Sequence, residues 1–228
     1  MPNINPGNDG NFKVDNAADW DTARDATTAT VSTPTNHTIK IATSSGPFDI
    51  YRSMQAYDTS SISVTPASAV LWMRGAGVQV GNNIIIMKVN AGATGASGAA
   101  FVDGDFDQID WDTAYSAEIT INSGTWARNT FNGIISLNAT ALSDMNSLSE
   151  FKFAIVTMTD YNDDGTAAST KTGTGWYSKG GGNSSRWPYI AYVEGSAGYG
   201  NNVNGVDSAN IGKVDGVATA DIEKVSGV

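Results

Sequence analysis

The sequence predicts an all-β fold: a two-sheet antiparallel β-sandwich, similar to a jelly roll, with one short helix and a short repetitive C-terminal arm. Three features of the sequence predict it. Polar and apolar residues alternate over short segments, clusters of Gly, Asn, Asp, Ser and Pro separate these segments, and a repeat follows the last of them. Such alternation is typical of half-buried strands, and such clusters are typical of turns. We therefore expect a β-sandwich domain over residues 1–195 and a C-terminal repeat arm over residues 196–228.

Eight segments are expected to be strands, because each is short, rich in β-branched or aromatic residues, and bounded by turn-forming residues. These segments are 38–41, 50–57, 69–74, 83–90, 117–121, 131–137, 151–157 and 188–194. The acidic stretch 103–112 and the glycine-rich stretches 173–175 and 180–182 are expected to be loops. The helix is expected over residues 139–146, with Asn138 as its N-cap and with Leu142 and Met145 on one face.

The composition narrows the classes of function. The 228 residues carry a formal net charge of -10, and such a surface repels nucleic-acid phosphates and anionic membranes. The absence of cysteine excludes disulfides and thiolate metal sites. No apolar run is long enough to span a bilayer, and the N-terminus lacks the pattern of a signal peptide. We expect synthesis in the cytoplasm without a signal peptide, no nucleic-acid partner and no membrane insertion.

The C-terminal arm repeats with a period of 11 residues. Val203, Val214 and Val225 are spaced by this period, and Ile211 and Ile222 keep the same step. A unit this short has no core of its own, so a neighbouring copy or another protein must cover its apolar side chains. The arm is therefore predicted to drive assembly into a homo-oligomer, such as a trimer, or docking onto another protein; the alternative is a flexible linker. The expected assembly residues are Val203, Val206, Ile211, Val214, Val217, Ile222 and Val225.

Catalysis is not expected from this sequence. His37 is its only histidine, so a Ser-His-Asp triad would have to use it. We expect His37 instead to be a solvent-facing or hydrogen-bonded strand residue. The aspartates of stretch 103–112 would need a partner carboxylate across a cleft to act as a glycosidase pair. We therefore predict that the protein is not an enzyme and that it has no cofactor other than, under one interpretation, calcium.

The calcium interpretation comes from a short acidic motif. Asp160, Asn162 and Asp164 precede Gly165 in the pattern D-x-N-x-D-G, which opens a calcium-binding loop. The twelfth position is Lys171, where an EF-hand has a bidentate Glu, so a looser calcium site is the form expected. The alternative is a polar surface turn.

The 6 tryptophans suggest a way to bind sugars, because their flat apolar faces can stack on a sugar ring. Trp111, Trp126 and Trp176 lie near expected turns or strand ends and are the candidates for a glycan platform. Packing in the core or at its rim is the alternative for each of them. Trp72 lies in an apolar strand and is expected to be in the core, and Trp187, which precedes Pro188, is expected to be a packing residue.

Four blocks of the sequence resemble DNRLRE-type domains. Residues 48–62, FDIYRSMQAYDTSSI, resemble the strand R-x-x-x-x-F-D-T-S-S-I of that family. Residues 67–72 resemble the strand I-x-S-A-x-L-x-L, and residues 130–157 resemble the segment F-x-L-N-x-x-A-L-x-x-I-N followed by F-x-I. Residues 175–192 resemble the closing strands Y-S and P-x-L-x-V-x-Y, with Ile in place of the closing Leu.

The resemblance covers roughly residues 12–195 and implies a β-sandwich similar to carbohydrate-binding modules. Similar sequences are found in phage and environmental virus proteins, and the arm resembles short repeats of phage structural proteins. The resemblance thus implies a phage virion structural protein, either a capsid decoration or a tail-fibre-type component, with other virion proteins as partners and the virion as its location. The alternative that it implies is a carbohydrate-binding adhesin that attaches to a host surface glycan.

Overall fold

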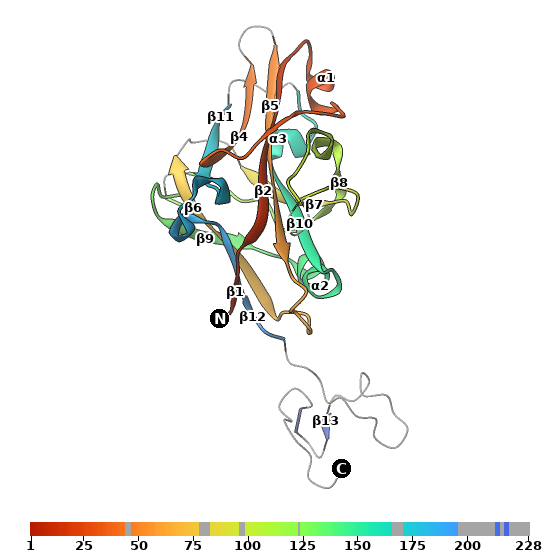
Figure 1. The fold of residues 1–228 in the computed structure, drawn as a ribbon, viewed down its shortest axis with the longest axis vertical. Helices are drawn as coiled ribbons and strands as arrows, with labels where there is room; N and C mark the ends of the chain where they lie inside the picture. Colours follow the sequence, from red (N-terminus) through yellow and green to blue (C-terminus); the bar gives the residue numbers. More distant parts are fainter. Residues whose placement is uncertain are drawn as a thin grey trace.

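The computed structural model describes residues 1–43, 47–77, 83–95, 99–122, 124–165, 171–195, 213–214 and 217–218 (Figure 1). The described chain is mostly β-structure with antiparallel strand pairing, which confirms the predicted β-rich class. Its strands form one large sheet of 12 strands and one small sheet of two. None of the helices in these ranges is long and apolar enough to cross a membrane.

The large sheet runs in the order β1-β12-β6-β11-β4-β5-β10-β7-β8, while β2 pairs with β5 and β3, and β9 pairs with β6. Its strands are β1 (Asn3–Ile4), β2 (Pro6–Ala17), β3 (Thr30–Ser32), β4 (Asn36–Thr43), β5 (Phe48–Asp58), β6 (Ser68–Gly77), β7 (Ile84–Val89), β8 (Ile109–Ala114), β9 (Phe131–Ser136), β10 (Glu150–Thr157), β11 (Lys171–Tyr177) and β12 (Tyr189–Val193). Because β11 pairs with both β4 and β6, backbone hydrogen bonds join all of these strands. The division into two separate sheets therefore stays a prediction.

The predicted helix is present as α2 (Ala139–Ser147), and the side chain of Asn138 caps it by accepting a hydrogen bond from the backbone N–H of Ala141 at 3.0 Å. Met145 is buried, and Leu142 packs against the core, as the spacing indicates. The other helical segments were not expected. They are α1 (Trp20–Arg24), α3 (Met158–Tyr161) and three short 3-10 turns, η1 (Asp103–Asp107), η2 (Lys179–Gly181) and η3 (Ser184–Arg186).

Two hydrophobic clusters lie on opposite faces of β10. Phe153 and Ile155 belong to the first cluster, while Ala154 and Val156 belong to the second, as the alternation of side chains along a strand requires. We call these two clusters the first core and the second core. The first core also contains apolar residues of β6, β9, β12 and α2, and the second core contains residues of α1 and η1. Both faces of the central strands are therefore covered, which explains the continuous apolar run of residues 153–156 in β10.

Three predictions about strands are wrong. Residues 117–121 contribute only an isolated bridge, between Ile119 and Ile84. Residues 109–114 form β8 instead of a loop; β8 is the last strand in the path of the sheet, where acidic side chains can face solvent. Residues 173–175 lie within β11 instead of a hairpin loop.

Candidate ligand-binding surface

The structure places two of the three predicted glycan-binding tryptophans inside the protein. Trp126 and Trp176 are fully buried in the first core, so neither presents a ring face to solvent. Trp111 is partly buried on β8, and two guanidinium groups lie over its ring, with Arg24 at 4.7 Å and Arg52 at 4.9 Å from the ring centroid. Two guanidinium groups of the protein itself thus already lie over the ring on which a sugar would have to stack.

The predicted calcium ligand Asp160 is engaged in a buried ion pair. Its two carboxylate oxygens accept hydrogen bonds from Nε and Nη2 of Arg52, at 2.8 and 2.9 Å. Asp160 is buried, whereas Asn162 is exposed to solvent. A cation at Asp160 would have to displace the guanidinium and leave Arg52 buried without its counter-ion, which is costly. Within the described ranges, no group of three or more His, Cys, Asp or Glu side chains is placed to hold a metal ion.

His37 is buried, so the solvent-facing alternative is wrong, and the other alternative is met only in part: Nδ1 is hydrogen-bonded, whereas Nε2 has no hydrogen-bond partner in the described part of the chain. Nδ1 lies 2.7 Å from Oγ of Ser53, and Nε2 lies 3.8 Å from Oδ1 of Asp9. These are the three residue types of a catalytic triad, but all three residues are buried, so a substrate cannot reach the serine in this structure. Burial lowers the pKa of His37 to about 3. Burial also raises the pKa of Asp9 to about 6, against the opposing effect of hydrogen bonds from the backbone of Lys179 and Gly180 and of the Lys179 charge.

Most of the predicted assembly residues lie outside the described ranges. Val203, Val206, Ile211, Ile222 and Val225 are in this group. Val214 and Val217 are directly opposite each other in the small antiparallel sheet of β13 (Lys213–Val214) and β14 (Val217–Ala218). The assembly role of the arm therefore stays a prediction.

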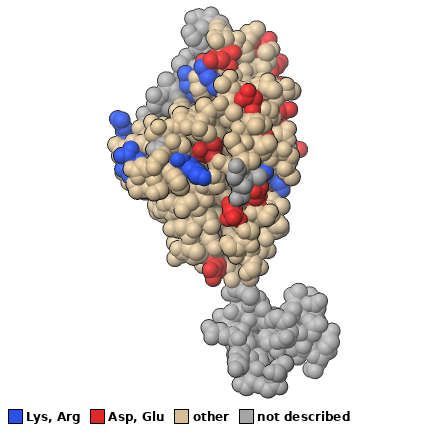
Figure 2. Space-filling view, viewed as in Figure 1, with Lys and Arg blue, Asp and Glu red and all other residues tan. Residues whose placement is uncertain are grey.

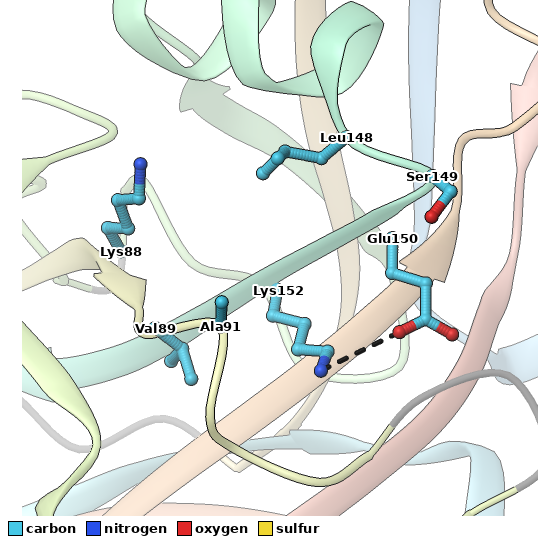
Figure 3. A pocket seen from close by; sticks show the side chains of 7 residues that line it. All are labelled: Lys88, Val89, Ala91, Leu148, Ser149, Glu150 and Lys152. Atoms are coloured by element: carbon cyan, nitrogen blue, oxygen red, sulfur yellow. Dashed lines mark ion pairs between the residues drawn. The ribbon is translucent and has the colours of Figure 1, made fainter.

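A small cavity of about 270 Å³ lies between the end of β7 and the start of β10. Figure 3 shows the side chains of Lys88, Leu148 and Lys152 around it. Both lysines already have partners: Lys88 pairs with Asp144 at 2.8 Å, and Lys152 donates to the carbonyl oxygen of Ala93 at 2.7 Å. The cavity therefore offers a ligand few unused polar groups.

A group of partly exposed aromatic side chains lies on the outer face of β6, β9 and β12. Leu71 and Met73 of β6 point into the first core, so the residue between them, Trp72, points away from it. Tyr189 of β12 is directly opposite Trp72 in the strand pairing. Phe131 of β9 contacts Tyr189, with ring centroids 5.3 Å apart. We call Trp72, Tyr189 and Phe131 the aromatic platform.

The indole ring of Trp72 lies flat against the backbone of β9. A Cβ atom built on Gly133 would lie 2.5 to 2.6 Å from three atoms of that ring, so the ring can take this position only because residue 133 has no side chain. The rings of Trp72 and Tyr189 are nearly parallel, with an interplanar angle of 6° and centroids 6.1 Å apart. One face of the indole is thus covered by the sheet while the side chain keeps partial exposure to solvent.

Arginine and lysine side chains border the platform. The guanidinium groups of Arg186 and Arg74 lie over the ring of Tyr177, at 4.9 and 5.8 Å from its centroid. Lys179 lies over the ring of Trp187 at 5.7 Å. We call Arg74, Tyr177, Lys179, Arg186 and Trp187 the cationic cluster.

The cationic cluster and the platform are continuous. Arg74 is two residues after Trp72 on the same face of β6, and it is directly opposite Phe131 in the pairing with β9. Arg186 and Trp187 lead into β12, which begins at the platform residue Tyr189. Side chains from four separate parts of the chain thus form one surface.

The sequence of β6 contains a pattern that indicates this surface. Placing Trp72 in the core is inconsistent with that pattern. Leu71, Trp72, Met73 and Arg74 alternate, and a charged residue at position 74 marks the even-numbered side of β6 as the outer one. Trp72 is on that side, which shows that its expected place in the core is wrong.

No family model matches the chain, and no curated protein matches it. The resemblance to DNRLRE-type domains therefore stays a prediction, and the function of the candidate site has to be inferred from its geometry.

Proposed function

We propose that the protein is a non-enzymatic carbohydrate-binding module that binds a glycan on the aromatic platform. The observation that carries this proposal is the flat position of the Trp72 ring on Gly133, next to the nearly parallel ring of Tyr189. The apolar faces of sugar rings pack on such aromatic faces, while the hydroxyl groups need polar neighbours to orient them. Arg74 and Tyr177 are adjacent polar groups that can serve this purpose.

The proposal that the protein has no catalytic activity rests on the burial and pairing of the side chains that could act in catalysis. Ser53, His37 and Asp9 are buried, and Asp160 is neutralised by Arg52. The platform presents aromatic rings and the adjoining cationic cluster presents cations, rather than the pair of carboxylates that glycoside hydrolysis needs. The protein would thus hold a glycan without cleaving it.

A binding screen followed by calorimetry tests this proposal. Wild-type protein is screened on a broad glycan array, and the Kd for a bound oligosaccharide is then measured for Trp72→Ala and Gly133→Ala. We expect a loss of about 5- to 150-fold for Trp72→Ala, taking the roughly 1 to 3 kcal/mol that stacking of a nucleic-acid base on an aromatic side chain is worth as the scale for a stacked sugar. Gly133→Ala keeps every aromatic residue but displaces the Trp72 ring, so it should weaken binding as well.

Leu148→Ala is the matched control, because Leu148 is an exposed apolar residue away from the platform, at the cavity between β7 and β10. It should leave the Kd unchanged. If Leu148→Ala abolishes binding and both platform variants retain it, the proposed site is wrong.

We also propose that the large sheet folds over the first core as a two-layer, jelly-roll-like sandwich. Leu71, Ile135 and Ile190 come from β6, β9 and β12, and they share that core with Phe153 and Ile155 of β10. This arrangement would leave the outer face of β6, β9 and β12 free to carry the platform.

A second candidate function is that of a virion structural component, a capsid decoration or a tail-fibre-type protein, that assembles through its C-terminal arm. The 11-residue repeat favours it, as does the pairing of β13 with β14 and with no other strand in the described chain. Replacing Ile211, Val214, Ile222 and Val225 by Asp should abolish oligomer formation or particle binding and leave glycan binding intact. Unchanged assembly in size-exclusion chromatography and particle sedimentation would reject this function.

A further inference from the structure

We infer that the glycan held on the platform is acidic, and that the cationic cluster binds its carboxylate groups. This inference rests on the proposed carbohydrate-binding function and names the class of sugar: a uronic acid or another sugar that bears a carboxylate. The observation behind it is the juxtaposition of the aromatic platform with arginines that have no carboxylate partner.

Some positive charges of the described chain have an ion pair, and others, Lys40 among them, have none. The formal net charge of the protein is -10, and Arg24, Arg52, Lys88 and Lys152 each pair with an Asp or Glu. Arg74, Arg128 and Arg186, by contrast, have no ion pair with any residue in the described ranges. Figure 2 shows Lys and Arg atoms, without Asp or Glu atoms, at the left edge of the molecule, the side on which Figure 1 places β6 and β9.

The cluster also has more hydrogen-bond donors than acceptors. The Nε atoms of Arg74 and Arg186 and the indole N–H of Trp187 are enclosed and have no hydrogen-bond partner in the described part of the chain. The hydroxyl group of Tyr177 donates to Oδ1 of Asn129 at 2.9 Å, so that acceptor is already used. A ligand does not reach these enclosed atoms in this structure, so a carboxylate would bind the terminal nitrogens of the guanidinium groups, in the bidentate geometry that such groups prefer.

The cluster holds its guanidinium groups in place before a ligand arrives. Arg74 and Arg186 both lie over Tyr177, and cation–π contacts restrict long side chains that would otherwise move freely in solvent. Restricting the side chains beforehand reduces the entropy lost on binding. A stacked guanidinium group also keeps its terminal nitrogens available for a bidentate bond to a carboxylate.

The spacing suits one extended ligand. Arg74 is two residues from Trp72, about 7 Å along the strand. A sugar ring stacked on Trp72 therefore brings a carboxylate on itself or on the next unit close to Arg74. Single-stranded nucleic acid also combines rings with negative charge, so it is the competing ligand that the experiment must distinguish from an acidic glycan.

Paired ligands that differ only in charge test this inference. Oligogalacturonate and an oligouronate from alginate are compared by calorimetry with the same oligosaccharides as methyl esters, which lack the negative charge, and with a sulfated neutral oligosaccharide and single-stranded DNA. We expect at least one acidic oligosaccharide to bind about tenfold or more tightly than its methyl ester, since charge-assisted bidentate bonds are the stronger kind. Salt should reduce this preference.

The variant Arg74→Gln/Arg186→Gln should bind the acid and the ester equally well, while Trp72→Ala should weaken the binding of both. Lys40→Gln, which removes a cation over Tyr51 at a different place on the sheet, is the matched control and should keep the preference. Circular dichroism and Tm confirm that each variant is folded.

Equal affinity for acid and ester in the wild type overturns this inference and leaves the proposed glycan binding in place. Tighter binding of the sulfated oligosaccharide or of DNA than of every carboxylated ligand overturns it too. Failure to bind any glycan, on the array or in solution, contradicts the proposed function itself.

Discussion

At the scale of single residues, Asp9 and His37 make opposite contributions to the pH dependence of stability. The pKa of His37 is about 3 in the folded protein, below its usual value of 6.5, so the unfolded state takes up a proton first and stability falls as the pH drops below 6.5. The pKa of Asp9 is about 6, above its usual 3.8, so the folded state takes up a proton first and stability rises as the pH falls from 6 to 3.8. Between pH 6 and pH 4 the two contributions largely cancel.

Asp9→Asn removes one of these contributions and leaves the other. Relative to wild type, the free energy of unfolding of Asp9→Asn should fall by about 2 kcal/mol as the pH goes from 6 to 4, since each pH unit in this window is worth about 1.4 kcal/mol. Urea unfolding of both proteins at four pH values measures the difference, in which the shared titrating groups cancel. His37→Gln should shift the difference in the opposite direction, and parallel pH profiles for all three proteins would contradict this explanation.

The ion pair of Asp160 with Arg52 gives a second prediction at this scale. Asp160→Ala leaves a buried guanidinium group without its counter-ion and should lower the free energy of unfolding by about 3 to 5 kcal/mol. Asp25→Asn, which removes an exposed carboxylate next to Arg24, should cost less than about 1 kcal/mol. Adding calcium should not raise the Tm of wild type if Asp160 serves Arg52 rather than a metal ion, and a rise that Asp160→Ala abolishes would contradict the assignment.

At the scale of elements, the side chain of Asn138 makes two hydrogen bonds that fix α2 to the sheet. Its Oδ1 atom caps the helix by accepting from the backbone N–H of Ala141, and its Nδ2 atom donates to the carbonyl oxygen of Ala114 at the end of β8, at 2.7 Å. Asn138→Ala should lower the free energy of unfolding by about 1 to 2 kcal/mol. Thr140→Ala, at an exposed position of the same helix, is the control and should have little effect in thermal unfolding. Equal Tm values for the two variants would contradict the proposed role of the cap.

Local signals predicted some elements well and others poorly, for physical reasons. The cap and spacing of α2 and the apolar runs of β7 and β10 are visible in the sequence because they depend on nearby residues. β2 is different: its sequence, PGNDGNFKVDNA, is largely polar, and it is a strand because it pairs with β5 over most of its length. Such tertiary pairing overrides local propensity and cannot be read from one segment.

The candidate site was missed for a similar reason. Trp72, Phe131, Tyr177 and Tyr189 are far apart in the sequence, and only strand pairing brings them together. By contrast, Trp126 and Trp176 look like surface residues because they follow turn-forming sequences, yet their side chains fill the first core.

At the scale of the whole molecule, the residues that stabilise the described fold differ from those that form the proposed binding surface. The two cores cover both faces of the central strands, and the platform lies on the remaining outer face of β6, β9 and β12. Substitutions at the platform should therefore change ligand affinity more than stability. The 11-residue repeat would add a second function at this scale, since assembly places several platforms on one particle.

Multivalent binding follows if both proposed functions hold. The variant with Asp at positions 211, 214, 222 and 225 should keep the wild-type Kd for a soluble oligosaccharide but bind a glycan-coated surface at least about tenfold more weakly, because avidity is lost. Calorimetry and surface plasmon resonance measure the two quantities. Equal surface binding by the variant and wild type would show that the arm does not link the platforms.

The proposed function depends on stacking of the ligand on the Trp72 ring. The indole N–H signals of the 6 tryptophans, recorded by NMR during titration with an oligosaccharide that binds, test it most directly. We expect the Trp72 signal to shift most, the signal of Trp187 in the cationic cluster to shift as well, and the signals of the buried Trp126 and Trp176 to stay unchanged. A Trp72 signal that does not move at saturating ligand, while that of Trp111 shifts, would contradict this stacking.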